Sequence, residues 1–215
     1  MNYYTFGQQV AKKAAVPDIS DYLESYNTFD EGHRLDHIQT VQERAKRLAE
    51  KYAPKQLPLV DLAAQLHDIG LQRGRKDHEL SGAQMVAEDP RFDILGPTQK
   101  RLLVNAIKQH RASTGRPRSL MGRIVSDADR TGTELGPALR RAYGYGKANY
   151  PDYTKEQHIR RALEHLVEKY GPGGYGRRTY FPETDMELEN LSQSAQALLD
   201  KNDMATAQKL LQENR

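Results

Sequence analysis

The chain has 215 residues, a formal net charge of +3 and no cysteine. This length fits one large domain with its own core, and the lack of cysteine excludes disulfides and thiolate metal sites. Basic and acidic residues are interspersed, which is typical of solvated helix faces rather than of a polybasic arm. The sequence shows no signal-peptide pattern and no apolar run of about 20 residues. We therefore expect a cytoplasmic protein without a membrane partner.

Helical periodicity dominates the sequence. Residues 36–52 repeat apolar side chains at steps of three and four, which predicts a helix with one apolar face. Residues 59–69 are apolar nearly all round, which predicts a buried helix that Gly70 would end. We find no strand pattern and no repeat, so the predicted fold class is all-α. Further amphipathic helices are predicted over residues 78–88, 98–110, 119–130, 154–170 and 185–200.

Two segments are predicted to be loops with more than a connecting role. Residues 171–181 combine glycines and aromatic residues with Arg177 and Arg178, and glycine lets backbone approach a ligand closely. Residues 143–153 carry four tyrosines whose rings could stack on a base. An ordinary surface connection is the alternative for both segments. The four tyrosines are Tyr143, Tyr145, Tyr150 and Tyr153.

The most informative polar pair is His67-Asp68, at the end of the apolar segment 59–69. A buried carboxylate is costly unless something compensates for its charge, and a metal ion is one such compensation. Imidazole nitrogen and carboxylate oxygen together favour Mn, Fe, Co, Ni or Zn over Ca, with Mg also allowed. Taken alone, the pair favours a satisfied core pair over a pair of metal ligands.

The order of the other polar residues adds to this pair. His37 opens a predicted helix about 30 residues earlier, and Asp129 ends another about 60 residues later. The stretches HRLDHIQTV, AAQLHDIG, KDHELSGAQMV, IKQHR and IVSDADR follow one another over residues 33–131. In this order and spacing they resemble the HD superfamily of metal-dependent phosphohydrolases. The resemblance implies an HD-type helical domain with a motif-bearing core at about residues 30–135. With the helices predicted beyond it as a C-terminal extension over residues 136–215, we expect a single domain over residues 1–215.

The resemblance also implies the metal ligands. Asp127 competes with Asp129 for one position, but two residues so spaced point to opposite sides of a helix. Asp129 has the family's form, with a small residue before it and Arg130 after it. We therefore expect Asp129 to be the ligand and Asp127 to be a supporting or surface residue. The implied ligands of a divalent transition metal are His37, His67, Asp68 and Asp129, and the implied catalytic residues are His67 and Asp68.

A second layer of residues follows from the same resemblance. His78 and His110 stand where a branch of the family with two adjacent metals has ligands of the second ion. Arg111 replaces the further histidine of that branch, so we expect His78 and His110 to contact substrate phosphate in preference to a second metal. His33, four residues before His37, is expected to support the site. The expected substrate-binding residues are basic: Lys76, Arg111, Arg130, Arg177 and Arg178.

The implied reaction is hydrolysis of a phosphate ester by metal-activated water. A nucleotide, or another small phosphorylated metabolite, is the expected substrate. Two alternatives stay open: a two-metal oxygenase of the HD type, which needs a full second set of ligands, and a non-catalytic nucleotide-binding regulatory module. The modest net charge and the lack of a binding motif argue against a nucleic-acid partner. The sequence leaves a monomer and a homodimer both open.

Overall fold

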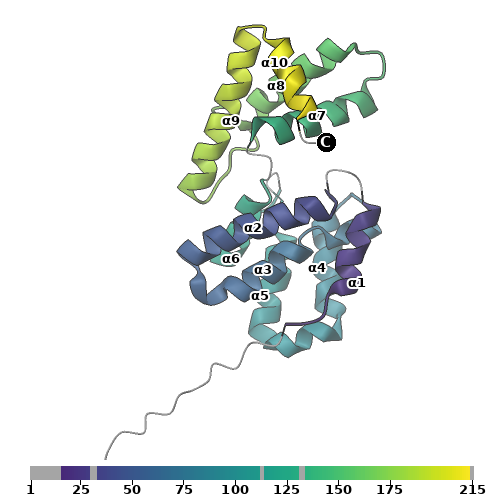
Figure 1. Cartoon of the computed structure of the whole chain (residues 1–215). Coiled ribbons are helices and arrows are strands. Elements are labelled where there is room, and N and C mark those ends of the chain that lie inside the picture. The colour runs from purple at the N-terminus through teal and green to yellow at the C-terminus, as the bar shows by residue number, and fades with distance from the viewer. Residues whose placement is uncertain (1–15, 30–32, 112–113, 131–133, 214–215) are drawn as a thin grey trace, which may run out of the picture.

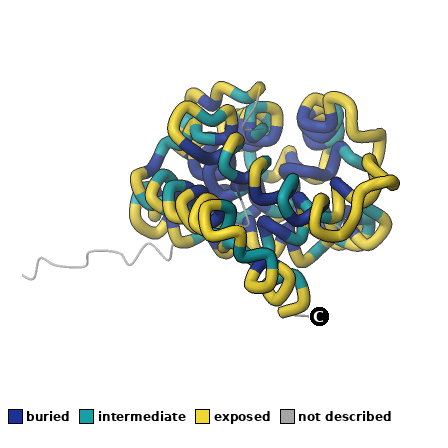
Figure 2. The backbone as a smooth tube through the Cα atoms, turned by 90° about the horizontal axis from the view of Figure 1, so that it is seen from above, coloured by how far each residue is buried: buried dark blue, intermediate teal, exposed yellow. Residues whose placement is uncertain are grey.

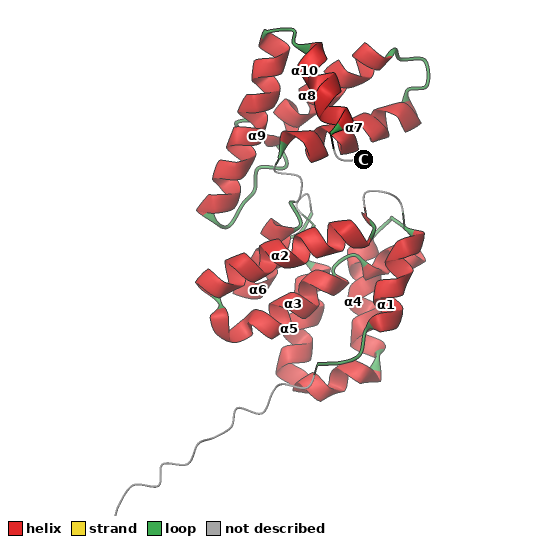
Figure 3. Ribbon diagram, in the orientation of Figure 1, coloured by secondary structure: helices red, strands yellow, loops and turns green. Residues whose placement is uncertain are grey.

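The computed structural model describes residues 16–29, 33–111, 114–130 and 134–213, and every regular element in these ranges is a helix. The predicted all-α class is therefore confirmed. Figures 1 and 3 show two lobes, with α1 to α6 in one and α7 to α10 in the other. Each lobe has its own cluster of buried apolar side chains. None of the helices in the described ranges is both long and apolar enough to cross a lipid bilayer.

The N-terminal lobe is built around α3, which contacts α2, α5 and α6. Its residues Val60, Ala63 and Leu66 are completely buried, as expected for a helix that is apolar nearly all round. Figure 2 shows that buried backbone lies on the inner sides of the helices and exposed backbone on the outside. The helices of this lobe are α1 (Ser20–Ser25), α2 (Leu35–Tyr52), α3 (Leu57–Leu66), α4 (His78–Glu88), α5 (Gly96–Lys108) and α6 (Leu120–Ala128).

The end of α3 differs from the prediction of a helix over residues 59–69. The helix ends at Leu66, and after Asp68 (φ −100°, ψ 6°) a 3-10 turn, η4, runs over Ile69–Arg73. The predicted stop residue, Gly70, lies in this turn and packs directly on α4. A Cβ at Gly70 would lie 1.9 Å from the backbone oxygen of His78. This contact of backbone on backbone turns the chain early and brings Asp68 beside the start of α4.

The C-terminal lobe is a separate layer of helices in which α8 packs against α7 and α9. The prediction of a loop over residues 143–153 is wrong, because residues up to Asn149 belong to α7. Gly146 is buried there, and a Cβ on it would lie 3.2 Å from Nδ1 of His158, so this glycine allows α7 to approach α8. Neither α1 nor α10 was predicted. The helices of this lobe are α7 (Leu135–Asn149), α8 (Lys155–Tyr170), α9 (Pro182–Asp200) and α10 (Met204–Gln212).

The lobes meet where the start of α9 lies against α2. The ring of Phe181 belongs to the N-terminal core, and its centroid is 4.6 Å from that of Tyr52. The hydroxyl group of Tyr52 donates to the carboxylate of Glu183 at 2.9 Å, and Nη2 of Arg44 lies 2.6 Å from Oε2 of Glu187. Such contacts support our proposal that the C-terminal helices extend the motif-bearing core as one domain.

Candidate metal centre

Four polar side chains converge where the start of α2 meets the ends of α3 and α6. His37 lies in the first turn of α2, His67 and Asp68 follow the last residue of α3, and Asp129 follows the last residue of α6. One ligand atom from each of these residues lies within 4.8 Å of the others. The histidines and Asp68 are buried, and Asp129 is partly exposed. The structure thus brings together the four residues that the resemblance implies as metal ligands.

The ring of His67 is oriented toward the two carboxylates. Its Nδ1–H donates to the backbone oxygen of Ala64 at 2.8 Å, because a carbonyl group can only accept. In the neutral ring, Nε2 therefore carries the lone pair, 3.2 Å from Oδ2 of Asp68 and 3.4 Å from Oδ1 of Asp129. This buried Nε2 has no hydrogen-bond partner among the described residues. A lone pair that faces two carboxylates needs a cation or a proton between them, so the donor set fits a divalent metal.

His37 completes this first group. Its Nε2 lies 3.5 Å from Oδ2 of Asp68 and 3.4 Å from Oδ1 of Asp129, the same two oxygens that His67 faces. The rings of His37 and His67 have centroids 5.4 Å apart. Two imidazole nitrogens and two carboxylate oxygens therefore enclose one common position.

The other oxygen of Asp68 faces a second group. Oδ1 lies 3.0 Å from Nε2 of His78 and 3.4 Å from Nε2 of His110. The Nδ1–H of each ring donates to a carbonyl three residues earlier, that of Arg75 at 3.2 Å and that of Ile107 at 2.7 Å. Asp68, His78 and His110 also place one ligand atom each within 4.8 Å of the others. Asp68 thus divides its two oxygens between two sets of nitrogen donors.

Burial and charge set the ionisation of these groups. Burial raises the pKa of Asp68, but His67, His110 and His37 outweigh this and hold its pKa well below the usual range. Burial lowers the pKa of His67, but Asp68 and Asp129 outweigh this and hold its pKa well above the usual range. The carboxylate of Asp68 and the imidazole of His67 therefore favour each other's charged forms. A metal ion bound here would replace the imidazole proton.

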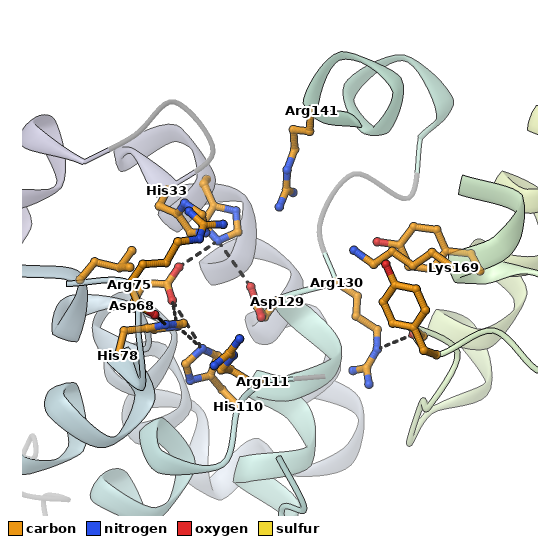
Figure 4. Close-up of a pocket in the computed structure, with 15 residues that line it drawn as sticks. His33, Asp68, Arg75, His78, His110, Arg111, Asp129, Arg130, Arg141 and Lys169 are labelled. Atoms are coloured by element: carbon orange, nitrogen blue, oxygen red, sulfur yellow. Dashed lines mark hydrogen bonds and ion pairs between the residues drawn. The ribbon is translucent and has the colours of Figure 1, made fainter. Parts of the chain in front are cut away.

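Both groups lie at a cleft of about 240 Å³ that opens between the lobes, and all of their residues except the fully buried His67 line it (Figure 4). Arg111, which lines it, pairs with Glu79 at 3.2 Å. The C-terminal lobe contributes Tyr170, Tyr175 and Gly176 to the lining. The cleft is strongly cationic around its acidic floor, with five basic residues in its lining: Arg75, Arg111, Arg130, Arg141 and Lys169.

The expected supporting and substrate residues divide into two sets. His33, Arg111 and Arg130 line the cleft, and the ring centroid of His33 is 5.8 Å from that of His37. The other three do not line it. Lys76 and Arg178 are exposed elsewhere, and Arg177 forms ion pairs within its own lobe.

Seven lining residues were not among the site residues expected from the sequence: Leu71, Arg75, Arg141, Lys169, Tyr170, Tyr175 and Gly176. The resemblance ends before the C-terminal lobe, so it gave no signal for Arg141, Lys169 or Tyr170. The glycine-rich segment 171–181 was the one signal, and it contributes Tyr175 and Gly176 rather than its arginines. Arg75 lies beside the expected Lys76.

The tyrosines of residues 143–153 do not line the cleft either. Tyr150 stacks on Tyr153 with centroids 5.2 Å apart, and the guanidinium group of Arg161 lies over the ring of Tyr145. Tyr143 packs edge-on against His158. These rings therefore pack against one another within the C-terminal lobe.

Asp127 and Arg130 fasten the C-terminal lobe to α6. Asp127 is completely buried, accepts hydrogen bonds from the backbone N–H groups of Tyr180 (2.9 Å) and Phe181 (3.0 Å), and pairs with Nη1 of Arg130 at 2.9 Å. Arg130 also donates to the backbone oxygens of Gly176 (3.3 Å) and Arg178. Asp127 is therefore a supporting residue, not a surface one. It ties the segment beyond Gly176 to the helix that carries Asp129.

The comparison with known families agrees with this geometry. Residues 34–133 match the family model of the HD domain. No significant match was found among curated proteins or solved structures. HD domains bind divalent metals and define a superfamily of the metal-dependent hydrolase type, and the buried His/Asp cluster fits such binding. The chain therefore carries an HD domain over residues 34–133.

Proposed function

We propose that this protein is a metal-dependent phosphohydrolase that acts on a small phosphate ester, with a nucleotide as the first choice. One observation carries the proposal: a buried cluster of metal-ligand type opens into a cleft lined by five cationic side chains. Cationic side chains attract an anionic substrate and can offset the charge that develops in phosphoryl transfer. The mixed nitrogen and oxygen donors suit Mn, Fe, Co, Ni or Zn, with Mg also allowed.

Each residue of the cluster has a defined part in this proposal. A divalent metal held by His37, His67, Asp68 and Asp129 would lower the pKa of a water molecule and polarise a phosphoryl oxygen. The backbone carbonyl of Ala64 holds the ring of His67 in the tautomer that a metal requires. Asp68, whose two oxygens face the two groups of nitrogen donors, would orient the attacking water.

The second group changes one expectation from the sequence. Asp68, His78 and His110 supply three ligand atoms within 4.8 Å of one another, and three protein ligands suffice for a catalytic ion. We therefore propose a second cation at this group, in place of direct phosphate contact. Arg75 and Arg111 would then hold the substrate phosphate from the N-terminal side of the cleft.

The test is a metal and substrate screen on the whole chain. The protein is stripped with a chelator, reloaded with each metal, and assayed for metal content and for phosphate release from p-nitrophenyl phosphate and nucleotides. We expect metal-dependent release, and we expect Asp68→Ala to lose both metal and activity. Asp93→Ala, which removes an exposed carboxylate paired with Lys100, is the matched control.

Two outcomes would refute the proposal: no bound metal in the wild type, or full activity in Asp68→Ala. Iron content with oxygen consumption would favour the oxygenase alternative. Metal-independent nucleotide binding without hydrolysis, seen as a melting shift, would favour the regulatory module.

A further inference from the structure

The C-terminal lobe presents a lysine to the cleft that has no carboxylate partner within the described part of the chain. Lys169 lies in the last turn of α8, is half-buried and lines the cleft. Its Nζ lies 4.9 Å from the centroid of the Tyr170 ring. Partial withdrawal of an ammonium group from water without a counter-ion is costly. An anion in the cleft would compensate for that cost.

The glycine-rich segment holds this lysine in place. The N–H of Gly176 donates to the backbone oxygen of Lys169 at 2.9 Å. A Cβ on Gly174 would lie 2.4 Å from that oxygen, and a Cβ on Gly176 would lie 2.8 Å from Cγ of Lys169. Residues with side chains would therefore collide with the backbone or the stem of the lysine. The segment closes on Lys169 and brings the ring of Tyr175 to the cleft.

The cleft thus has cations on two sides. Figure 4 shows Lys169 on the C-terminal lobe, across the opening from Asp68, with Arg141 of α7 projecting from above. Arg75 and Arg111 lie on the N-terminal side, near Asp68 and His110. A substrate with one phosphate at the metal centre would leave Lys169 without an anion. A second anionic group on the same substrate would provide one.

We propose that Lys169, with Arg141 lining the same cleft, forms a distal anion subsite that selects phosphate esters bearing a second anionic group. Nucleoside diphosphates and triphosphates belong to this class. The half-exposed ring of Tyr175 offers an apolar face beside the subsite, against which the organic part of such a substrate packs. This inference rests on the proposed phosphohydrolase function.

The test compares Lys169→Ala with Lys155→Ala. Lys155 opens the same helix, is exposed and lies outside the cleft lining, so its variant is a matched control. For nucleoside diphosphates and triphosphates we expect Lys169→Ala to raise KM about tenfold or more, the scale of one lost charged hydrogen bond. KM for p-nitrophenyl phosphate stays within about twofold, and kcat changes little for either class. Lys169→Arg, which keeps the charge, recovers most of the loss.

A binding measurement separates this inference from the proposed function. Inorganic pyrophosphate should raise the melting temperature of wild type and Lys155→Ala more than that of Lys169→Ala, whereas inorganic phosphate should act equally on all three. Equal pyrophosphate shifts in the two variants, or equal changes in KM for both substrate classes, would overturn the subsite. A wild type without hydrolysis but with the pyrophosphate difference would refute the function and leave the subsite supported.

Discussion

Each lobe buries a histidine with one ring nitrogen that has no hydrogen-bond partner among the described residues, but the surroundings differ. Nε2 of His67 faces the carboxylates of Asp68 and Asp129 at 3.2 Å and 3.4 Å. His158 instead lies against the rings of Tyr143 and Tyr153, with centroid distances of 5.7 Å and 5.6 Å. An unsatisfied ring nitrogen therefore indicates a ligand site only where acidic oxygens share the space.

The same contrast extends to the whole lobes. The N-terminal lobe buries ionisable groups at the ends of its helices, where a metal would compensate for their desolvation. The C-terminal lobe has an apolar core and turns cations toward the cleft. We infer that the first lobe carries the chemistry and the second selects the substrate.

The largest expected effect comes from exchanging the two buried histidines for alanine. His67→Ala removes a proposed metal ligand, so metal affinity should fall by at least about 100-fold and activity should disappear. His158→Ala removes an aromatic packing partner, so it should lower the melting temperature and leave the metal content unchanged. Metal analysis by mass spectrometry, together with thermal melting, checks both. Loss of metal in His158→Ala would contradict the assignment of metal binding to the N-terminal lobe alone.

The next effect concerns the connection between the lobes. Asp127→Ala should cost about 3–5 kcal/mol in the free energy of unfolding, because it leaves buried Arg130 and two backbone N–H groups without their acceptor. Chemical denaturation measures this cost. Asp185→Ala, on the surface of α9, is the control and should cost about 1 kcal/mol or less. Equal costs would show that Asp127 does not tie the lobes together.

The sequence predicted the N-terminal lobe better than the C-terminal one, for physical reasons. The apolar steps of α2 and the uniform apolarity of α3 report burial directly, and α2 was predicted to within one residue. In α7, Gly146 and the tyrosines read as a loop because glycine usually ends helices. Gly146 instead allows α7 to approach α8 closely. This is a tertiary contact, which the local sequence pattern does not indicate.

The candidate site divides in the same way. Motif order located His37, His67, Asp68 and Asp129, and the structure brings them within ligand distance of one another. Lys169 and its neighbours reach the cleft only through the packing of one lobe on the other. Arg177 lies in the segment that the sequence singled out, but its side chain turns to α9. Composition could identify that segment without showing which of its residues faces the cleft.

A smaller effect distinguishes two glycines of the C-terminal lobe. Gly174→Ala places a Cβ against the backbone oxygen of Lys169 and should cost about 1–3 kcal/mol in stability. It should also raise KM for the substrates that need Lys169. Gly144→Ala adds a Cβ to open space on an exposed helix and should gain up to about 1 kcal/mol. Thermal melting with steady-state kinetics checks the pair. A neutral Gly174→Ala would contradict the role of the segment in holding Lys169.

The smallest effect concerns Arg177, which the sequence suggested for substrate binding. Its Nε lies 3.0 Å from Oδ1 of Asp185, and this hydrogen bond holds the pKa of Asp185 below its ordinary 3.8. A carboxyl group with a lowered pKa in the folded state contributes stability at neutral pH, and the contribution is lost as the pH falls through that pKa. Arg177→Ala should therefore be slightly less stable than the wild type at neutral pH. The difference should shrink as the pH falls below the ordinary pKa values of Asp185 and Glu189, the two carboxyl groups that pair with Arg177, and vanish below their lowered folded-state pKa values.

Kinetics give the sharper half of this last prediction. Because Arg177 does not line the cleft, KM and kcat of Arg177→Ala should stay within about twofold of wild type for every substrate. Lys169→Ala, at the end of α8, is expected instead to raise KM for nucleoside diphosphates and triphosphates but not for p-nitrophenyl phosphate. If Arg177→Ala also raised KM for diphosphates alone, the whole segment would act as one cationic surface. That result would contradict the assignment of substrate binding to Lys169 and of a purely structural role to Arg177.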